Sequence, residues 1–416
     1  MGLGNSRAMT RLVLGIAAVT LSYAQSSEDP VDVLEQMRDK LIARLPRGPR
    51  YSCVATIDRS YFSRKSPPLN PLSCERIYLD RKAGRNKLQL DKTDRLRLRV
   101  VVTGGQELYS WTGPSNFSRD VDEVLEPGPA GTGEFGTHLA DIFTNPAVQL
   151  RLLSQNENKL EYGFRVPIEA SSYVVWGGTE WRKTGYAGSM IINPASLELK
   201  RLTLETGQLG PETSMCEATG ALDFPSVGAG MLLPSRSESY FVLSDTTEAE
   251  RVTTFSDCQE SPEKASESPP ELPAPVRKDV RIELAFTTGI DTRTAAAGDV
   301  VTAKLAGLTP GIPSGATFTG RIMRMEHHLD KQGIPRSGGG VDLSGQRFFL
   351  IWIVFDRMEV KGVVSSFQAE YSCSTCISIK GKKWEHAFVF PTEAPNFVVP
   401  AGFTSKWVTR DGPSSK

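Results

Sequence analysis

The chain has 416 residues with 48 basic and 48 acidic side chains, so its formal net charge is zero. Apolar residues make up 39% and charged residues 23%, which is typical of a globular protein with one or more packed cores. The balanced charge creates no field that would attract a polyanion, so we expect no nucleic-acid binding. Beyond the N-terminus no run of about 20 apolar residues occurs, and the sequence therefore predicts no transmembrane helix in the mature chain.

Residues 1–24 have the pattern of a secretory signal peptide. Arg7 and Arg11 precede the apolar run Leu12–Leu21, and Ser22 and Ala24 supply the small residues of a cleavage site. We expect this segment to be removed and the protein to be exported to the periplasm or the extracellular space. The alternative, an uncleaved membrane anchor, is disfavoured because the apolar run is short for a membrane span.

Six cysteines remain after the signal segment, and an even number in an oxidising compartment favours disulfide bonds. Proximity along the chain predicts the pairs Cys53–Cys74, Cys216–Cys258 and Cys373–Cys376. The main alternative joins Cys53 to Cys258, which would link the first and last strands of one domain.

Residues 25–258 are predicted to form a mainly β (α+β) domain that begins with one long helix. Asp29 is a capping residue and Pro30 suits the first helical position. The following apolar residues recur at spacings of three and four, which gives the helix one apolar face: Leu34, Met37, Leu41 and Leu45. A shorter helix is expected over residues 134–143.

From Tyr51 the apolar period changes to two, which predicts an antiparallel sheet with one solvated face. The clearest strand covers residues 95–102. Its apolar face carries Leu96, Leu98, Val100 and Val102, and its other face carries Arg95, Arg97 and Arg99. Gly104 and Gly105 lead into a hairpin partner that contains Tyr109 and Trp111. Residues 77–79 are predicted as a further strand that pairs with residues 88–90.

The remainder divides into a linker, a second domain and a tail. Residues 259–278 contain five prolines and few large apolar residues, which predicts an extended linker. Residues 279–410 are expected to form a smaller β-barrel or sandwich, in which the uninterrupted apolar run 348–355 is a central strand. The polar, glycine-rich stretch between Met325 and Arg347 is expected to be a mobile hairpin loop. Residues 411–416 are predicted to be a disordered tail.

The order of these elements resembles a known family. A signal, a long amphipathic helix and an antiparallel meander containing GSMIINPASLELKRLTLE resemble the periplasmic half-barrel family of LolA, LolB and RseB. The segments LPRGPRYSCVATIDRS, LLPSRSESYFVL and TTFSDC also resemble a set of secreted proteins, chiefly acidobacterial. The resemblance implies a curved antiparallel half-barrel sheet, covered by a helix, whose concave apolar face takes acyl chains.

The second domain carries a different resemblance. AAAGDVVTAKL followed by IPSGATFTGRI is similar to a small β-domain of secreted bacterial proteins and to the β-barrel of TrbI-type conjugation proteins. Gly298-Asp299 and Ser314-Gly315 are the turns of that pattern. The long proline-rich arm typical of the conjugation proteins is absent.

Two short motifs have chemical interpretations that their surroundings disfavour. The G-x-G-x-x-G at Gly131–Gly136 is not preceded by a strand, so we interpret it as a loop that enters a helix and expect no cofactor. Cys373 and Cys376 form a C-x-x-C with strand-like flanks, which favours a structural disulfide over redox exchange or a metal site.

The histidines give no clear site. His327 and His328, with Glu326 and Asp330, have metal-ligating side chains, but adjacent residues of a strand point to opposite faces. We therefore interpret them as part of a solvated loop and expect no metal. The Arg95, Arg97 and Arg99 stripe is interpreted most simply as a solvated strand face, with contact to anionic lipid headgroups as the alternative.

These observations favour an exported, non-enzymatic binding or carrier protein of the cell envelope. The expected ligand is a lipid or a lipoprotein acyl chain, lined by Leu96, Leu98, Val100, Val102, Tyr109 and Trp111, with apolar burial as the driving force. The same side chains in a closed core are the alternative interpretation. Two further candidates are an envelope module that binds another protein without a small ligand, and a thiol–disulfide exchange protein that uses Cys373 and Cys376.

Overall fold

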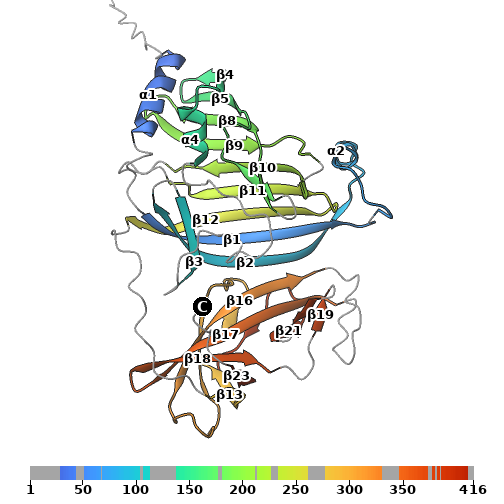
Figure 1. The fold of residues 1–416 in the computed structure, drawn as a ribbon, viewed down its shortest axis with the longest axis vertical. Helices are drawn as coiled ribbons and strands as arrows, with labels where there is room; N and C mark the ends of the chain where they lie inside the picture. Colours follow the sequence, from blue (N-terminus) through green and yellow to red (C-terminus); the bar gives the residue numbers. More distant parts are fainter. Residues whose placement is uncertain are drawn as a thin grey trace, which may run out of the picture.

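The computed structural model describes most of the chain after residue 28, in the ranges 29–43, 51–66, 68–103, 106–112, 137–176, 180–210, 213–225, 233–260, 277–329, 346–372, 377–379, 382–384 and 386–410. These residues confirm the mainly β fold class. They form an upper lobe with a long curved sheet and a lower lobe with a closed barrel (Figure 1). Within them, no helix is long and apolar enough to cross a membrane.

The upper lobe is built on an antiparallel sheet in the order β4-β5-β8-β9-β10-β11-β12-β1-β2-β3. In chain order its strands are β1 (Tyr51–Arg64), β2 (Leu88–Thr103), β3 (Gln106–Trp111), β4 (Gln149–Asn156), β5 (Lys159–Val166), β8 (Tyr186–Asn193), β9 (Glu198–Glu205), β10 (Met215–Asp223), β11 (Arg236–Leu243) and β12 (Glu248–Glu260). A small separate pair is formed by β6 (Val174–Trp176) and β7 (Trp181–Lys183).

Two helices, α1 (Pro30–Ile42) and α4 (Thr137–Thr144), lie over the β5–β9 side of this sheet (Figure 1). The Asp29 side chain caps α1 by accepting a hydrogen bond from the Val31 amide at 2.9 Å. The predicted helix is confirmed, and its buried residues are Val33, Met37 and Leu41. Met37 and Leu41 belong to the predicted face, whereas Val33 is buried more fully than the predicted Leu34.

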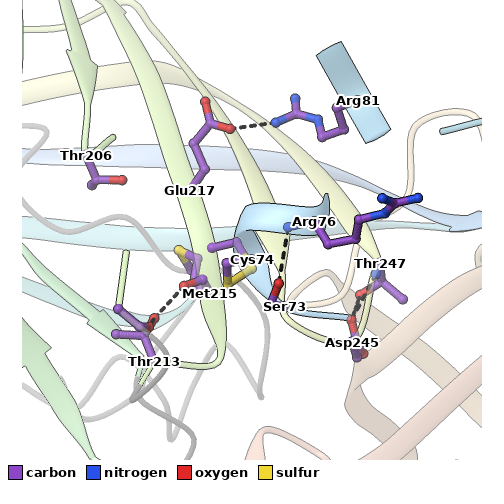
Figure 2. Close-up of a disulfide and its surroundings, with 12 residues drawn as sticks. Ser73, Cys74, Arg76, Arg81, Thr206, Thr213, Met215, Glu217, Asp245 and Thr247 are labelled. Atoms are coloured by element: carbon purple, nitrogen blue, oxygen red, sulfur yellow. Dashed lines mark hydrogen bonds and ion pairs between the residues drawn. A yellow bond between two sulfur atoms is a disulfide. The ribbon is translucent and has the colours of Figure 1, made fainter. Parts of the chain in front are cut away.

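A third helix, α2 (Cys74–Lys82), corrects the predicted strand at residues 77–79. The Ser73 hydroxyl accepts a hydrogen bond from the Arg76 amide at 3.2 Å, which caps a new helix there. Cys74 forms a disulfide with Cys216 of β10 (Figure 2). Ile77 is buried in one cluster with Cys216. Apolar residues at 77 and 79 are compatible with a strand, but the Ser73 cap and the Cys74–Cys216 disulfide stabilise a helix here.

The lower lobe is a closed six-stranded antiparallel barrel in the order β13-β15-β16-β17-β18-β23, with β23 pairing back to β13. This confirms a barrel as the second fold. Its strands are β13 (Arg281–Phe286), β15 (Val300–Leu305), β16 (Thr317–His328), β17 (Phe348–Val360), β18 (Val363–Tyr371) and β23 (Thr404–Thr409). Shorter strands are β14 (Ile290–Asp291), β19 (Ile377–Ile379), β20 (Lys382–Trp384), β21 (Ala387–Pro391) and β22 (Val398–Val399).

The barrel core is rich in aromatic side chains. Phe318, Phe355 and Trp407 are fully buried at its centre, and Phe355 meets Trp407 edge-on with ring centroids 4.8 Å apart. As predicted, β17 is a central strand: it pairs with β16, β18 and β21, and its first four residues are buried.

Candidate functional site

The inner face of the upper sheet, on which α1 and α4 lie, carries two adjacent rows of side chains. Directly paired residues of neighbouring strands point to the same side of a sheet. The pairings make one row of Tyr162, Met190, Leu202, Leu222, Ser237, Thr253, Ile57 and Leu96. The next row is Phe164, Gly188, Leu204, Gly220, Ser239, Arg251, Arg59 and Asp94. Along both rows the character changes from apolar to polar near β11.

The apolar end of the face lies under the two helices. Met37 of α1 and Ile142 of α4 pack into one cluster with Met190, Leu202 and Leu222 of the sheet. Among the described residues, two hydrogen bonds join α1 to the sheet region, from the Lys40 ammonium to the Ser196 carbonyl and from the Tyr162 hydroxyl to the Pro30 carbonyl. Apolar contact therefore holds this helix in place far more than hydrogen bonding does.

A polar strip on β11 and β12 follows the apolar end. Ser237, Arg251 and Thr253 are all at least 97% buried. The Thr253 hydroxyl is buried and lacks a hydrogen-bond partner within the described part of the chain. The strip divides the inner face into two apolar regions. The alternation of apolar and polar residues in the sequence does not reveal this division.

The predicted ligand-lining residues lie in the second apolar region. Leu96, Leu98, Val100 and Tyr109 are buried together, with Trp111 packed against them and Cys53, Ala55 and Ile57 beside them. Ala297 of the lower lobe completes this cluster. A ligand-lining role would require the cluster to open, and it stays a prediction. The side chain of Val102 lies outside the described residues.

The free edge of β2 joins the two lobes. Residues Lys92–Asp94 pair with β16, and the Arg97 amide and the Arg95 carbonyl bond to the backbone of Ala297 at 2.7 and 2.8 Å. Beyond these, β2 pairs with β3 from Leu98 onward. Figure 1 shows β2 and β16 facing each other across this junction. One strand edge is thus filled in turn by β16, by the Ala297 segment and by β3.

The arginine stripe of β2 serves this junction, which differs from the solvated face predicted for it. Arg97 pairs with Asp299 and donates to the Thr294 carbonyl, and Arg95 pairs with Asp58 and donates to the Arg293 carbonyl. Arg99 donates to the Ser52 hydroxyl of the upper lobe at 2.9 Å. The alternation correctly separated the two faces of the strand, but the partner of the polar face comes from another lobe.

Gly298 permits the close approach of this segment. Its φ is +106°, and a Cβ at this position would lie 2.1 Å from the Arg97 carbonyl oxygen. A side chain is therefore excluded by both conformation and space.

Charged residues are buried where β1, β2 and β16 meet. The Arg59 guanidinium binds both carboxylate oxygens of Asp94, at 2.6 and 3.0 Å. Glu326 lies beside this pair and contacts Lys92 at 3.1 Å and His328 at 2.7 Å. Burial acts to raise the pKa of Glu326, but the hydrogen bond from His328 and the charge of Lys92 outweigh it and hold the pKa well below its usual range.

The two adjacent histidines correct the predicted solvated loop. Strand β16 continues through Glu326 to His328, and these residues pair with both β17 and β2. His327 stacks on Phe349 with ring centroids 4.1 Å apart. Burial, with Arg347 and His328 nearby, lowers the pKa of His327 to about 4. Among the described residues, no group of three or more metal-ligating side chains is suitably placed for an ion.

The disulfides differ from the pairing by proximity. The structure joins Cys53 to Cys258 and Cys74 to Cys216, so the alternative Cys53–Cys258 pair is confirmed and the pairs Cys53–Cys74 and Cys216–Cys258 are wrong. Pairing of β1 with β12 brings the first and last strands together, which proximity along the chain cannot show.

Several predicted features lie outside the described residues. They are the signal segment 1–24, Leu45, the motif at Gly131–Gly136, Cys373 and Cys376, the tail 411–416 and most of the linker and of the loop between Met325 and Arg347.

Comparison with solved structures finds three similar chains, among them a LolA superfamily protein. The fold resembles the crystal structure of a LolA superfamily protein from Nitrosomonas europaea, with 10% sequence identity and a TM-score of 0.26, over 55% of this chain and 94% of that one. No family model matches the sequence, and no curated protein does.

Proposed function

We propose that this protein is an exported, non-enzymatic binding protein that shelters an apolar ligand, such as the acyl chain of a lipid or lipoprotein, on the inner face of its upper sheet. The observation that supports it is the apolar region under α1 and α4, where Met190, Leu202 and Leu222 are covered. Of these two helices, α1 is joined to the sheet region by two hydrogen bonds among the described residues. Moving α1 would open an apolar surface without breaking a strand pairing, and an acyl chain would gain from burial there.

Export is part of the proposal. The two disulfides support it, because such bonds persist in oxidising compartments. The polar strip at Arg251 and Thr253 would limit how far a chain extends from the helix-covered region toward Leu98.

Uptake of a fluorescent fatty acid by the delipidated mature protein tests the proposal. Lys40→Cys and Ser196→Cys, bridged by a bismaleimide, would tie α1 to the turn that its Lys40 contacts. We expect micromolar uptake by the wild type. The bridged protein should lose at least about tenfold in affinity, or about 1.4 kcal/mol, because the bridge keeps α1 on the apolar surface that the ligand needs. The single-cysteine variants, treated with the same reagent, are the controls.

Each outcome is informative. If the bridged protein takes up fatty acid as well as the wild type does, the ligand would be assigned to the cluster of Leu96, Leu98 and Val100 instead. A wild type that takes up no fatty acid, and from which solvent extracts no lipid, would overturn the carrier proposal in favour of an envelope module that binds another protein.

A further inference from the structure

A cavity of about 300 Å³ lies at the junction of the two lobes. The adjacent strands β1, β2 and β16 line it together with Phe349 of β17 and the segments around Thr292 and Asn396. Cavities between two structural units are a common place for small-ligand sites. This cavity is separate from the helix-covered inner face, which is formed by other strands.

The charges in the cavity wall are already compensated. The pairs are Arg59 with Asp94, Arg95 with Asp58, Arg293 with Asp291, and Glu326 with Lys92 and His328. A charged ligand would have to leave water without finding an uncompensated partner, which costs free energy. The wall therefore favours an uncharged ligand.

Uncharged hydrogen-bonding groups form a row on one side of the cavity. Ser60 of β1 is paired directly with Thr93 of β2, and Thr93 is paired with His327 of β16. These three side chains therefore point to the same face of three adjacent strands. The Nε2 atom of His327 is buried and has no hydrogen-bond partner among the residues that the structure describes. Asn396, which also lines the cavity, adds an amide.

The chemistry of this row matches hydroxyl groups. Because its pKa is lowered to about 4, the His327 ring is neutral at pH 7 and has one donor and one acceptor nitrogen. A hydroxyl group is also both donor and acceptor, as are the side chains of Ser60 and Thr93. Met325 and Phe349 give the cavity an apolar portion that suits C–H groups. The volume equals that of about ten water molecules at about 30 Å³ each, which is room for one sugar ring.

We infer that this interlobe cavity is a binding site for an uncharged, hydroxyl-rich ligand of monosaccharide size, recognised by the row Ser60, Thr93 and His327 together with Asn396. The ligand is either a free sugar or the terminal residue of a glycan.

Saturation-transfer NMR and calorimetry on the mature full chain test this inference. The probes are N-acetylglucosamine and its β-1,4-linked trimer, with glucuronate and glucosamine as charged counterparts. We expect an uncharged probe to bind, the charged sugars to bind at least about tenfold more weakly, and Thr93→Val to weaken binding by about tenfold through loss of a hydrogen bond. Tighter binding of the trimer would identify a glycan end, and tighter binding of the monomer a free sugar.

Thr56→Val is the matched control, since Thr56 lies on the same strand as Ser60 and is not part of the cavity wall. Asn396→Ala is the second test variant, because this exposed residue can be changed without disturbing a core. No binding of either uncharged probe at millimolar concentration would overturn the inference. Equal binding by the wild type, Thr93→Val and Asn396→Ala would overturn it too, as would a preference for glucuronate. None of these results depends on fatty-acid uptake.

Discussion

At the scale of single residues, the main finding is a group of charges inside the sheet junction. Arg59 and Asp94 continue the same alternation that places Ile57 and Leu96 on the inner face, because Arg59 follows Ile57 by two residues and Asp94 precedes Leu96 by two. The sequence therefore contained a signal for a buried charged pair, namely a charge at an inward position. The sequence pattern could not show that Glu326 lies beside this pair, because Glu326 comes from the other lobe.

Removing one partner of this pair should be costly. We expect Asp94→Ala to lower the free energy of unfolding by about 3–5 kcal/mol, because it leaves the Arg59 guanidinium buried without its main partner. Urea unfolding measures this. The control is Asp223→Ala, which breaks the half-exposed pair with Arg201 and should cost at most about 1 kcal/mol. Equal losses in the two variants would show that the Arg59 pair contributes no more than a surface ion pair.

His327 should make stability depend on pH. Its pKa is about 4 in the folded protein against 6.5 for an ordinary histidine, so the unfolded chain takes up a proton at higher pH than the folded one. Its contribution to stability is therefore full above pH 6.5 and is lost as the pH falls toward 4. We expect the wild type to lose more stability than His327→Gln between pH 7.5 and pH 5 in urea unfolding. The same loss in both proteins would contradict the lowered pKa.

At the scale of elements, α2 shows how a tertiary bond selects local structure. Its residues contain no strong apolar periodicity, and half-exposed Leu79 contributes little to a core. The helix is held on the outer face of the sheet by the Cys74–Cys216 bridge and by the ion pair of Arg81 with Glu217 at 2.6 Å (Figure 2). The buried side chain of Ile77 adds an apolar contact. A helix of this kind depends on its attachment more than on its sequence.

Removal of that bridge should destabilise the protein. Cys74→Ser combined with Cys216→Ser opens a link between residues 142 positions apart, which the chain-entropy model values at about 4–5 kcal/mol. We expect a loss of that size in urea unfolding and earlier proteolytic cleavage near α2. A loss below about 1 kcal/mol would show that packing and ion pairs suffice to hold the helix. Intact mass adds a check on Cys373 and Cys376, whose predicted bridge would remove two further hydrogens.

At the scale of the whole molecule, the two lobes share one strand edge. Backbone bonds from β2 to β16 and to Ala297, together with the Arg97–Asp299 pair, connect them. Such a connection is more rigid than contact through side chains alone, because it adds directed hydrogen bonds to a packed interface. The lobes should therefore move as one unit.

Gly298→Ala tests this connection. The added Cβ would meet the Arg97 carbonyl at 2.1 Å, so the Ala297 segment should leave the edge of β2. The control, Gly315→Ala, has a positive φ of +83° but free space around it, and should cost about 1–2 kcal/mol through backbone strain alone. We expect Gly298→Ala to cost at least about 2 kcal/mol more and to increase the radius of gyration in small-angle scattering. Equal effects in the two variants would mean that this close approach does not hold the lobes together.

The sequence by itself determined the periodic features of this protein. Asp29 and Pro30 set the start of α1, alternation set the two faces of β1 and β2, and the uninterrupted apolar run set β17 as a central strand. These features depend on residues within one turn or one strand, where local geometry links spacing directly to orientation.

The tertiary structure alone decided what each face meets. It paired Cys53 with Cys258, turned the 74–82 segment into a helix, brought Ala297 onto the Leu98 cluster and placed Arg97 against Asp299. The partners in these contacts are 142 to 205 residues apart along the chain, and no local periodicity specifies them. Both proposed sites are of this kind, since one lies between a sheet and the helices that pack on it and the other between two lobes.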